Sequence, residues 1–592
     1  MTVNEKIDRL RKYMYENGLE AFIFPSTDPH CGEYVPEHWR TRQWISGFDG
    51  SAGTAVITQT KAALWTDSRY FLAAETQLCD TEYQLMKERI PGTPSIAQWL
   101  CMELKSGATV GMDGWVNTLS GTKEMQTELG RHGIRVDLSH DPADELWESR
   151  PAIPLNTIEI HPLKFAGENV TSKFRRLREI MEELRADGCI VSVLDEIAWL
   201  TNLRGSDVHC NPVFVSYLWV GAKDAVLYID PHKTPTDVRH YLQDEHIQTR
   251  PYEALADDLR HCTAHSVLLD PDTCNARLAS FLPDSCRPKW YPSAIPAMKA
   301  IKNECEIQGF RQAMLRDGVA MVKFLRWLKP AVEAGEQTEM SIDRRLTELR
   351  AMQPLFRGLS FDTIAAYGPH GAIVHYEATP ETDARLEPHG LLLLDSGAQY
   401  QDGTTDITRT IALGSVSQQE MLDYTLVLKG HLRLAMAKFP DGTCGTQLDA
   451  LARYDLWQHG MNFLHGTGHG VGSFLCVHEG PHQIRMNHVP APLCQGMTVT
   501  NEPGIYRAGS HGVRTENTML VVSADSTEFG RFLQLDPLTL CPIDTTPILR
   551  YLMLPDELEY LNKYHARVLN ELSPLLTDEE DLEWLRQACR PL

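Results

Sequence analysis

The chain has 592 residues, which is too long for a single hydrophobic core and predicts three or four domains. Its 43% hydrophobic and 23% charged residues are typical of a globular protein. The net charge of -23 disfavours nucleic acids and anionic membranes as partners, because both attract basic surfaces.

The N-terminal stretch MTVNEKIDRLRKYMYENGLEAF lacks both the apolar core and the cleavage site of a secretory signal. No apolar run reaches the length of about 18 residues that a membrane-spanning helix needs. The 14 cysteines are scattered without any C-x-x-C pair, as expected of free thiols in a reducing compartment. We therefore expect a cytoplasmic protein that does not contact a membrane.

The first half of the chain contains two segments of the same design. Apolar residues at helical spacing predict helices over residues 4–17 and 172–187, each closed by a glycine. A β-rich apolar run follows each helix: EAFIFPS after the first and CIVSVLD after the second. This parallel order indicates two related α/β units.

Further matches extend the repeat. Trp44 leads into ISGFDGS and Trp199 leads into LTNLRGS, an offset of 155 residues, and AALWTD is echoed later by AVLYID. Agreement of these features in the same order predicts an internal duplication. The corresponding domains span residues 1–154 and 155–300, joined near RPAIPLN.

The third region, residues 301–592, begins with the helical pattern NECEIQGFRQAMLRDGVAMVKFLRWL. Strand-like runs follow, among them LLLLDSGAQY, MTVTNEPGIY and TENTMLVV. Past Pro537 lies a helical tail that we expect to pack on this region rather than to form a separate unit. The extension therefore covers about residues 537–592.

Two glutamates in TVTNEPGIYRAGSHGVRTENTMLVV are placed symmetrically about Gly509. A hairpin centred on that glycine sets Glu502 directly opposite Glu516, with their Cβ atoms about 5 Å apart. Like charges so opposed repel, which favours either a shared proton or a bound cation.

Two aspartates lie in LLLLDSGAQYQDGTTDITRT. Asp395 directly follows four leucines, where burial is expected, and a buried carboxylate is costly unless something positive pairs with it. A loop centred between Tyr400 and Gln401 predicts that Asp395 lies opposite Asp406, although the turn dipeptide Asp-Gly comes slightly later. This register is less firmly specified than that of the glutamates.

Between the two pairs lies the segment LHGTGHGVGSFLCVHEGPH. Its five glycines disfavour a regular helix and allow the backbone to approach a ligand closely. Imidazole is the commonest nitrogen ligand for a transition metal. The segment contains His465, His469, His478 and His482.

Four carboxylates and one histidine suit two divalent cations about 3.5–4 Å apart. No cysteine lies among the proposed ligands, and this ligand type favours Mn²⁺, with Co²⁺, Fe²⁺ or Zn²⁺ able to compete. Taken singly, each carboxylate could cap a helix or face water, and the glycine-rich segment could be a surface loop. Such ordinary roles explain the joint order Asp, Asp, His, Glu, Glu poorly.

This order, with the words DSGAQYQDGTTDITRT, HGTGHGVG, EPG and TEN, resembles the pita-bread metallopeptidases. The longer words SGFDGSAGTA, LDEIAWLTNLRGSDV and HGTGHGVGSFLCVHEGP are similar to those of aminopeptidase P, the Xaa-Pro aminopeptidases, in their long cytosolic three-domain form. The resemblance covers nearly the whole chain. It implies an α/β (α+β) fold with two creatinase-like N-terminal domains, a pita-bread catalytic domain and a C-terminal helical extension, assembled as a homodimer through the catalytic domain.

The resemblance also implies a ligand set for two metals. Asp395 binds one metal and Asp406 bridges both. His469 and Glu502 bind the second metal, and Glu516 bridges. No member of the family's ligand set is missing from this sequence.

In that family a water or hydroxide that bridges the metals attacks the scissile carbonyl. The resemblance makes Glu502 the general base and gives His375 and His478 roles in catalysis, through hydrogen bonds to the intermediate and the peptide. His465 lines the pocket near the leaving proline. The substrate-contacting residues that it implies are His375, His465, His478, Tyr506 and Arg514.

The predicted function is removal of the N-terminal residue from peptides with proline at position two. A bond before proline lacks an N–H and has distinct cis/trans energetics, so a site shaped for the pyrrolidine ring is needed. One alternative is a prolidase-like Xaa-Pro dipeptidase, which needs a wall where a third residue would sit. Another is a non-catalytic peptide-binding pita-bread protein, which the complete ligand set disfavours.

Overall fold

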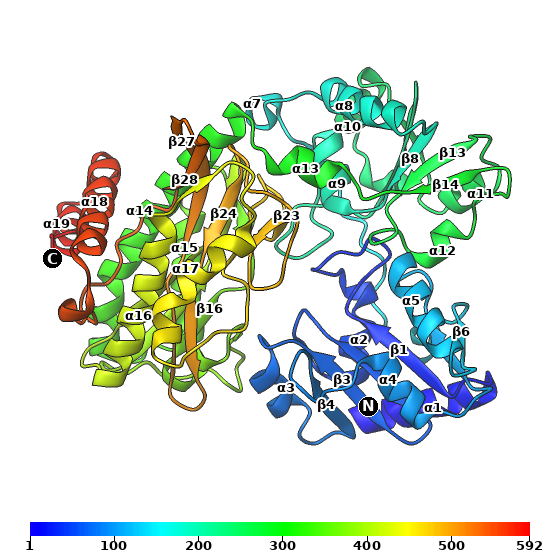
Figure 1. Cartoon of the computed structure of the whole chain (residues 1–592), viewed down its shortest axis with the longest axis horizontal. Helices are drawn as coiled ribbons and strands as arrows, with labels where there is room; N and C mark the ends of the chain where they lie inside the picture. Colours follow the sequence, from blue (N-terminus) through cyan, green and yellow to red (C-terminus); the bar gives the residue numbers. More distant parts are fainter. The chain divides into compact units, whose positions relative to one another are not determined.

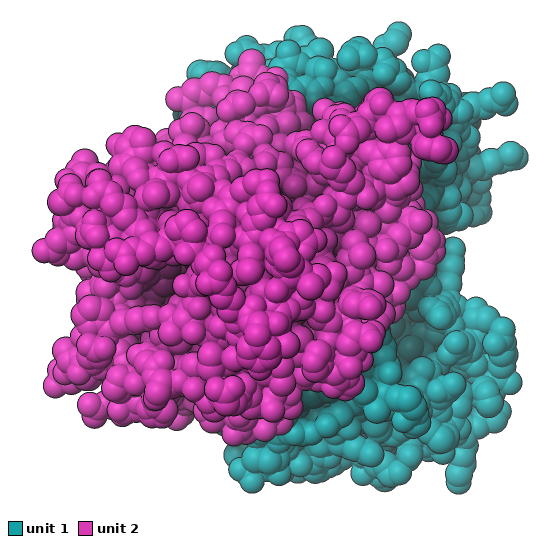
Figure 2. Space-filling view, turned by 60° about the vertical axis from the view of Figure 1, so that its left-hand side comes forward, with its two compact units in different colours: residues 1–162, 168–295 teal, residues 163–167, 296–592 magenta.

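The computed structural model describes residues 1–592, which divide into two compact units. The first unit comprises residues 1–162 and 168–295, and the second comprises residues 163–167 and 296–592 (Figure 2). None of the helices combines the length and the apolar character that crossing a bilayer requires.

The first unit contains two six-stranded sheets. One has the order β4-β3-β2-β1-β5-β6 and the other the order β12-β11-β10-β8-β13-β14. The strands of the first sheet are β1 (Ala21–Pro25), β2 (Thr54–Thr58), β3 (Ala62–Thr66), β4 (Tyr83–Lys87), β5 (Thr109–Met112) and β6 (Arg135–Asp137). Those of the second are β8 (Gly188–Val191), β10 (Tyr217–Gly221), β11 (Ala225–Tyr228), β12 (Gln248–Arg250), β13 (Ser266–Leu269) and β14 (Arg287–Trp290).

The two sheets repeat one topology strand for strand. In each, the first strand pairs antiparallel with the second and parallel with the fifth, and the third pairs parallel with the fourth. The helices α1 (Val3–Glu16) and α8 (Val170–Glu183) precede the equivalent strands β1 and β8. The prediction of two related α/β domains is confirmed, while the boundaries at residues 154 and 300 stay a prediction.

The second predicted helix ends earlier than expected. We expected it to reach residue 187, but α8 ends at Glu183 and Arg185 has a left-handed backbone with φ 52°. A non-glycine residue in that conformation interrupts an α-helix. The carboxylate of Asp187 accepts hydrogen bonds from the amides of His265 and Ser266, so it belongs to the junction with β13.

The second unit contains the long helix α14 (Glu304–Ala334), which packs against α15 (Glu339–Ala351). Helices α16 (Gln418–Ala435) and α17 (Gly445–Gln458) pack on each other, and all four run alongside the strands of this unit (Figure 1). The sheets have the orders β16-β17-β20, β21-β28-β27-β24 and β15-β18-β19, with the pairs β22-β23 and β25-β26.

These strands have the following bounds: β15 (Phe356–Leu359), β16 (Ile364–Tyr367), β17 (Leu391–Ser396), β18 (Ala398–Tyr400), β19 (Gly403–Thr404), β20 (Ile407–Ala412), β21 (Lys438–Pro440), β22 (Gly468–Gly470), β23 (Glu479–Ile484), β24 (Thr498–Asn501), β25 (Gly504–Arg507), β26 (His511–Arg514), β27 (Asn517–Thr527) and β28 (Gly530–Pro537). Strands β17 and β20 are buried along their whole lengths. The leucine run before Asp395 therefore lies in the core, as its composition predicts.

The chain after β28 forms α18 (Pro555–Leu572) and α19 (Glu579–Ala588). Leu561, Val568 and Leu572 of α18 are buried in one cluster with Leu428 and Leu432 of α16. Burial of such side chains stabilises the contact by roughly 1.5–3 kcal/mol each. The prediction that the tail packs on the third region is confirmed.

The glutamate hairpin has the predicted register. Strands β25 and β26 pair Gly504 with Arg514, and strands β24 and β27 pair Asn501 with Asn517. Both ladders are centred on Gly509, which has φ 71° in the turn. The two glutamates lie in the short gap between the ladders, at equivalent positions on opposite strands.

The aspartate register differs from the prediction. Asp395 pairs with Thr408, and the hairpin is centred between Gln401 and Asp402, one residue later than expected. The turn therefore includes the aspartate of the Asp-Gly dipeptide. Moving the centre by one residue shifts the register by two, which keeps side chains on the same face of the ladder. Asp406 consequently stays on the face of the ladder that carries Asp395.

Candidate metal centre

The second unit brings together predicted ligands from segments that are far apart in the sequence. One ligand atom from each of Asp406, His469 and Glu516 lies within 4.8 Å of the others. The Nε2 atom of His469 lies 3.5 Å from Asp406 Oδ2 and 3.3 Å from Glu502 Oε1. Four of the five predicted ligands thus meet at one imidazole nitrogen or next to it.

His469 reaches this position because β22 lies close against β24. A Cβ added to Gly468 would lie 1.9 Å from the carbonyl oxygen of Thr500, so only glycine allows this approach. The amide of His469 donates to Thr500 Oγ1 at 3.1 Å, and its Nδ1 lies 2.9 Å from the carbonyl oxygen of Gly470. With Nδ1 as the donor, Nε2 is free to accept or to bind a metal.

Glu516 is fixed by the neighbouring strand β20. Its amide donates to the carbonyl oxygen of Thr408 at 3.1 Å, and the Thr408 hydroxyl donates to Glu516 Oε2 at 2.9 Å. Thr500 plays a similar part for Glu502, because its hydroxyl donates to Glu502 Oε1 at 3.2 Å. Each glutamate therefore has one side-chain oxygen oriented by a threonine.

Asp395 is buried and paired on one side only. Arg514 donates to Asp395 Oδ2 from Nη2 at 2.8 Å and from Nε at 3.1 Å. The other oxygen, Oδ1, is buried without a hydrogen-bond partner. A buried polar atom left unpaired costs about 1–3 kcal/mol, so a bound cation would stabilise this arrangement.

The electrostatics of the cluster favour a cation in the same way. Burial raises the pKa of Asp406 well above its usual range, and the charges of Glu516, Asp395 and Glu502 raise it further. Burial and the neighbouring carboxylates Glu502 and Asp395 raise the pKa of Glu516 in the same direction. Positive charge placed among these groups would remove their mutual repulsion.

Glu502 and His469 form an oppositely charged pair within the cluster. Burial alone would raise the pKa of Glu502, but the hydrogen bond and charge of His469 lower it to about 2. Burial alone would lower the pKa of His469, but the hydrogen bond and charge of Glu502 raise it to about 9. In the metal-free protein the positively charged imidazolium of His469 therefore supplies part of the charge that a metal cation would supply.

The donor set fits divalent metal ions. It supplies carboxylate oxygens and one imidazole nitrogen, which suit Mn²⁺ and the related first-row metals better than soft thiolate ligands would. The orphaned Asp395 Oδ1 and the crowded acidic groups around Asp406 are the physical signs of such a site.

The predicted substrate residues form a chain beside the ligands. Arg514 Nη1 donates to the Tyr506 hydroxyl at 2.6 Å, and that hydroxyl lies 2.8 Å from His465 Nε2. Burial lowers the pKa of His465 to about 4, so its imidazole is neutral. The ring of Phe463 lies 4.8 Å from that of His465, centroid to centroid. The result is a ring-lined surface at one end of the ligand cluster.

Of the two other predicted histidines, His478 packs against a ligand, and His375 adjoins a residue whose backbone contacts Arg514. The ring of His478 is perpendicular to that of His469, with centroids 4.5 Å apart. His375 directly follows Val374, whose carbonyl oxygen accepts from Arg514 Nη2 at 3.2 Å. His482, the fourth histidine of the glycine-rich segment, instead binds the backbone of β24, with Nε2 2.7 Å from the carbonyl oxygen of Thr498.

Sequence reasoning missed the groups that orient these ligands. Thr408 and Thr500 are buried and contact a glutamate carboxylate each, and Arg409 contacts the backbone of Glu516. Buried threonines in strands are common, so their residue type alone carries no signal. The one hint in the sequence is Arg409, which lies within the buried strand segment ITRT. A buried arginine needs several hydrogen-bond partners, so its position indicates a polar network nearby.

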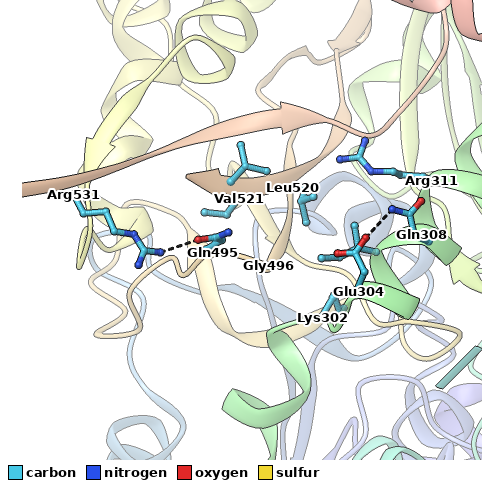
Figure 3. A pocket seen from close by; sticks show the side chains of 11 residues that line it. Lys302, Glu304, Gln308, Arg311, Gln495, Gly496, Leu520, Val521 and Arg531 are labelled. Carbon is cyan, nitrogen blue, oxygen red and sulfur yellow. Dashed lines mark hydrogen bonds between the residues drawn. The ribbon is translucent and has the colours of Figure 1, made fainter. Parts of the chain in front are cut away.

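A pocket elsewhere in the same unit, lined among others by Lys302, Glu304 and Arg531, shares no residue with the ligand cluster (Figure 3). Its volume is about 540 Å³. Its polar side chains already have partners: Gln308 donates to Glu304 at 2.8 Å and Arg531 donates to Gln495 at 2.8 Å within the lining, while Lys302 and Arg311 pair with Glu479 and Asp536 outside it. We therefore assign the chemistry to the ligand cluster and not to this pocket.

Four family models together match almost the whole chain. Two of them describe the Creatinase/Prolidase N-terminal domain and match residues 6–142 and 149–306. The model of Metallopeptidase family M24 matches residues 308–523, which include every predicted site residue. The model of the C-terminal region of peptidase_M24 matches residues 531–592.

Similar proteins align from end to end. Aminopeptidase P2 of Arabidopsis thaliana is 39% identical, over 100% of this chain and 89% of its own length. The probable Xaa-Pro aminopeptidase P of Laccaria bicolor is 40% identical, over 100% of this chain and 94% of its own length.

Solved structures agree with this likeness. X-prolyl aminopeptidase of Caenorhabditis elegans, described as a cytosolic enzyme with a di-nuclear active site, is 35% identical, with a TM-score of 0.96 and full coverage of both chains. The Xaa-Pro dipeptidase of Bacillus anthracis is 24% identical, with a TM-score of 0.52, and covers 64% of this chain and 99% of its own. The dipeptidase therefore shares the fold of part of this chain only.

Proposed function

Because the chain belongs to the aminopeptidase P (Xaa-Pro aminopeptidase) family within metallopeptidase family M24, we propose that it removes the N-terminal residue from peptides whose second residue is proline. The observation that carries this proposal is the convergence of Asp406, His469, Glu502 and Glu516 in a chain that aligns with these aminopeptidases over its full length. The prolidase-like alternative is weaker, because the dipeptidase likeness covers 64% of the chain.

We assign two divalent cations to Asp395, Asp406, His469, Glu502 and Glu516. The oxygen-rich donor set supports Mn²⁺ as the preferred ion, with Co²⁺, Fe²⁺ or Zn²⁺ able to compete. The description of the nematode relative as an enzyme with a di-nuclear active site supports the number of ions. Bound cations of this kind supply a nucleophile at neutral pH and Lewis-acid stabilisation of a developing oxyanion.

Glu502 is assigned as the general base. Its carboxylate lies beside His469, with Oε1 3.3 Å from the imidazole Nε2, where it can accept the proton of an attacking water. Thr500 occupies one lone pair of Oε1 and holds the carboxylate in place. We assign His375 and His478 to hydrogen bonds with the peptide and with the tetrahedral intermediate.

The chain of Arg514, Tyr506 and His465 is assigned to substrate positioning. Arg514 is held by Asp395 and in turn holds the Tyr506 hydroxyl, so this side of the site is rigid. His465 is neutral and packs against Phe463, which gives it the character of an apolar ring surface. Such a surface suits the pyrrolidine ring of proline, which offers no N–H to bind.

We further propose a cytoplasmic homodimer formed through the catalytic domain. The support is a row of exposed apolar side chains on α17, where Leu451, Tyr454 and Trp457 recur every three residues with 37%, 50% and 45% exposure. Leu464, beyond the helix end, adds 49% exposure. Contiguous exposed apolar side chains mark interaction surfaces. The description of the nematode relative as cytosolic supports the location.

A paired assay tests the function. The purified protein is incubated with Mn²⁺ and with an Xaa-Pro-Yaa tripeptide or an Xaa-Pro dipeptide, and metal content is measured on the same sample. An aminopeptidase cleaves the tripeptide, whereas a dipeptidase cleaves the dipeptide alone. A fully metallated protein that cleaves neither would instead be a peptide-binding relative.

A further inference from the structure

Arg409 of β20 is almost fully buried, at 2% exposure, and lies at the centre of a hydrogen-bond network. Its guanidinium donates to partners on three sides, from Nε, Nη1 and Nη2. An arginine buried in this way is held in one orientation, because its planar fork of donors matches fixed acceptors.

One side of this network is the candidate metal centre. Nη1 of Arg409 donates to the carbonyl oxygen of Glu516 at 2.6 Å and to that of Thr408 at 3.0 Å. Nη2 donates to Asn517 Oδ1 at 2.9 Å. The guanidinium therefore fixes the backbone of Glu516 and of Thr408, the threonine that orients the Glu516 carboxylate, and the side chain of Asn517.

The opposite side is the C-terminal extension, here residues 538–592. Arg409 donates to the carbonyl oxygen of Pro542 from Nε at 3.0 Å, and from Nη2 to that of Cys541 at 2.8 Å. The Tyr564 hydroxyl of α18 accepts from Nη2 of Arg409 at 3.0 Å and donates to the carbonyl oxygen of Cys541 at 2.9 Å. Tyr564 thus holds both the guanidinium and the loop that faces it.

We propose that the C-terminal extension is a positioning element of the metal centre, which acts through Tyr564 and Arg409 on Glu516. The extension contacts no proposed ligand itself. It holds the guanidinium against the backbone of Glu516, directly before β27, and so keeps that carboxylate where the cations need it. This inference rests on the proposed function, because it takes Glu516 to be a metal ligand.

A weakened network should lower the affinity for cations rather than abolish folding. A ligand must be held within about 0.5 Å of its productive position, so a small shift of the Glu516 backbone is felt by the metal. Loss of a partner that orients a metal ligand typically costs about 10–100-fold in metal affinity.

Tyr564→Phe is the central variant, because it removes only the hydroxyl and keeps the aromatic ring in the hydrophobic cluster that α18 forms with α16. We expect the dissociation constant for Mn²⁺, measured by titrating full-length apo-protein, to rise about tenfold. Arg409→Lys keeps the positive charge but loses the planar set of guanidinium donors, so it should raise the dissociation constant more. Peptidase activity of Tyr564→Phe should be low at limiting Mn²⁺ and recover at saturating Mn²⁺.

Glu557→Gln provides the matched control. Glu557 also belongs to α18, is fully buried, and binds Lys429 of α16 at 2.7 Å and 2.9 Å, away from the ligand strands. This variant disturbs the attachment of the same helix without touching the Arg409 network. It should lower the melting temperature and leave the dissociation constant for Mn²⁺ unchanged.

The inference is overturned if Tyr564→Phe binds Mn²⁺ as tightly as the wild type. It is also overturned if Glu557→Gln weakens Mn²⁺ binding as much as Tyr564→Phe, because the extension would then act through general stability. A wild-type protein that binds no Mn²⁺ would overturn the proposed metal site and this inference with it.

Discussion

Arg514 and Asp395 form a buried ion pair in which the arginine engages one carboxylate oxygen and leaves the other without a partner. Both guanidinium contacts, at 2.8 Å and 3.1 Å, go to Oδ2, while Oδ1 is buried and unpaired. The arginine lowers the cost of burying the carboxylate but does not saturate it. One oxygen therefore stays available to a cation.

Removal of that carboxylate should abolish turnover. We expect Asp395→Ala and Glu516→Ala each to reduce kcat by more than about 100-fold, because metal ions contribute several kcal/mol of transition-state stabilisation. Steady-state kinetics and elemental analysis on the same samples check this. A variant with full metal occupancy and wild-type kcat would contradict the assignment of its residue as a ligand.

Chelation should separate activity from folding. Apo-protein prepared with a chelator should be inactive yet keep its far-UV circular dichroism, because the ligands lie on or directly beside strands whose core is already closed by apolar packing. Adding back divalent ions should restore activity, with Mn²⁺ the most effective. Activity that persists after exhaustive chelation would contradict a metal-dependent mechanism.

Glu502→Gln tests the general base. The amide keeps the shape of the side chain and one oxygen for the metal but cannot accept the proton. We expect kcat to fall by roughly 10²–10⁴-fold with little change in KM, since the substrate residues remain. Metal occupancy must be measured in parallel. If a fully metallated variant keeps more than about a tenth of the wild-type kcat, another group takes the proton, with His375 the first candidate.

The affinity for cations should rise with pH. In the metal-free protein the pKa of His469 is about 9, so its imidazole carries a proton at neutral pH that a metal must displace. Release of that proton alone predicts about tenfold tighter binding per pH unit up to about pH 9, and the raised pKa values of Asp406 and Glu516 add to this dependence. Isothermal titration of apo-protein with Mn²⁺ in buffers of different ionisation enthalpy measures the protons released. Binding that is independent of pH between 6 and 8 would contradict this charge assignment.

Stability of the apo-protein should change in the opposite sense. The pKa of His469 is raised from 6.5 to about 9, so the stability it contributes is complete below pH 6.5 and is lost as pH rises through 9. The raised pKa values of Asp406 and Glu516 act in the same direction. Added Mn²⁺ should therefore raise the melting temperature more at pH 8.5 than at pH 6.5.

Trp457→Glu should convert the proposed homodimer into a monomer. A charge placed in the exposed row on α17 must be buried without a partner if the interface forms there. Sedimentation velocity gives the mass in solution. Tyr551→Glu, at a side chain with 79% exposure in the C-terminal extension, is the control and should leave the assembly intact. A dimeric Trp457→Glu variant would place the interface elsewhere.

The register of the two hairpins shows how far the sequence alone determines the site. The glutamate register followed from Gly509, because a turn glycine with positive φ sets the centre of both ladders. The aspartate register did not follow, because several residues could form the turn and the centre lies one residue later than expected. The error left Asp406 on the predicted face, since a slip of two residues preserves side-chain direction.

The Arg409 network could not have been predicted in this way. Its partners Cys541, Pro542 and Tyr564 lie 132, 133 and 155 residues further along the chain. Periodicity and turn signals describe neighbours within one element, whereas this contact depends on how the C-terminal extension folds back. Fold class and ligand order are local properties of the sequence, and the support behind the ligands is not.

The close approach of β22 to β24 limits how this protein can be engineered. Replacing glycine with alanine is a common route to thermostability and gains about 0.4–1 kcal/mol where the backbone allows it. Gly130, at the end of α5 (Leu119–Gly130), has no atom within 4 Å of an added Cβ and is open to this change. At Gly468 the same methyl group would meet the Thr500 carbonyl and push His469 away from the carboxylates. A library of variants that is screened for folding alone should therefore keep Gly468 fixed, because a substitution there would displace a metal ligand and reduce activity.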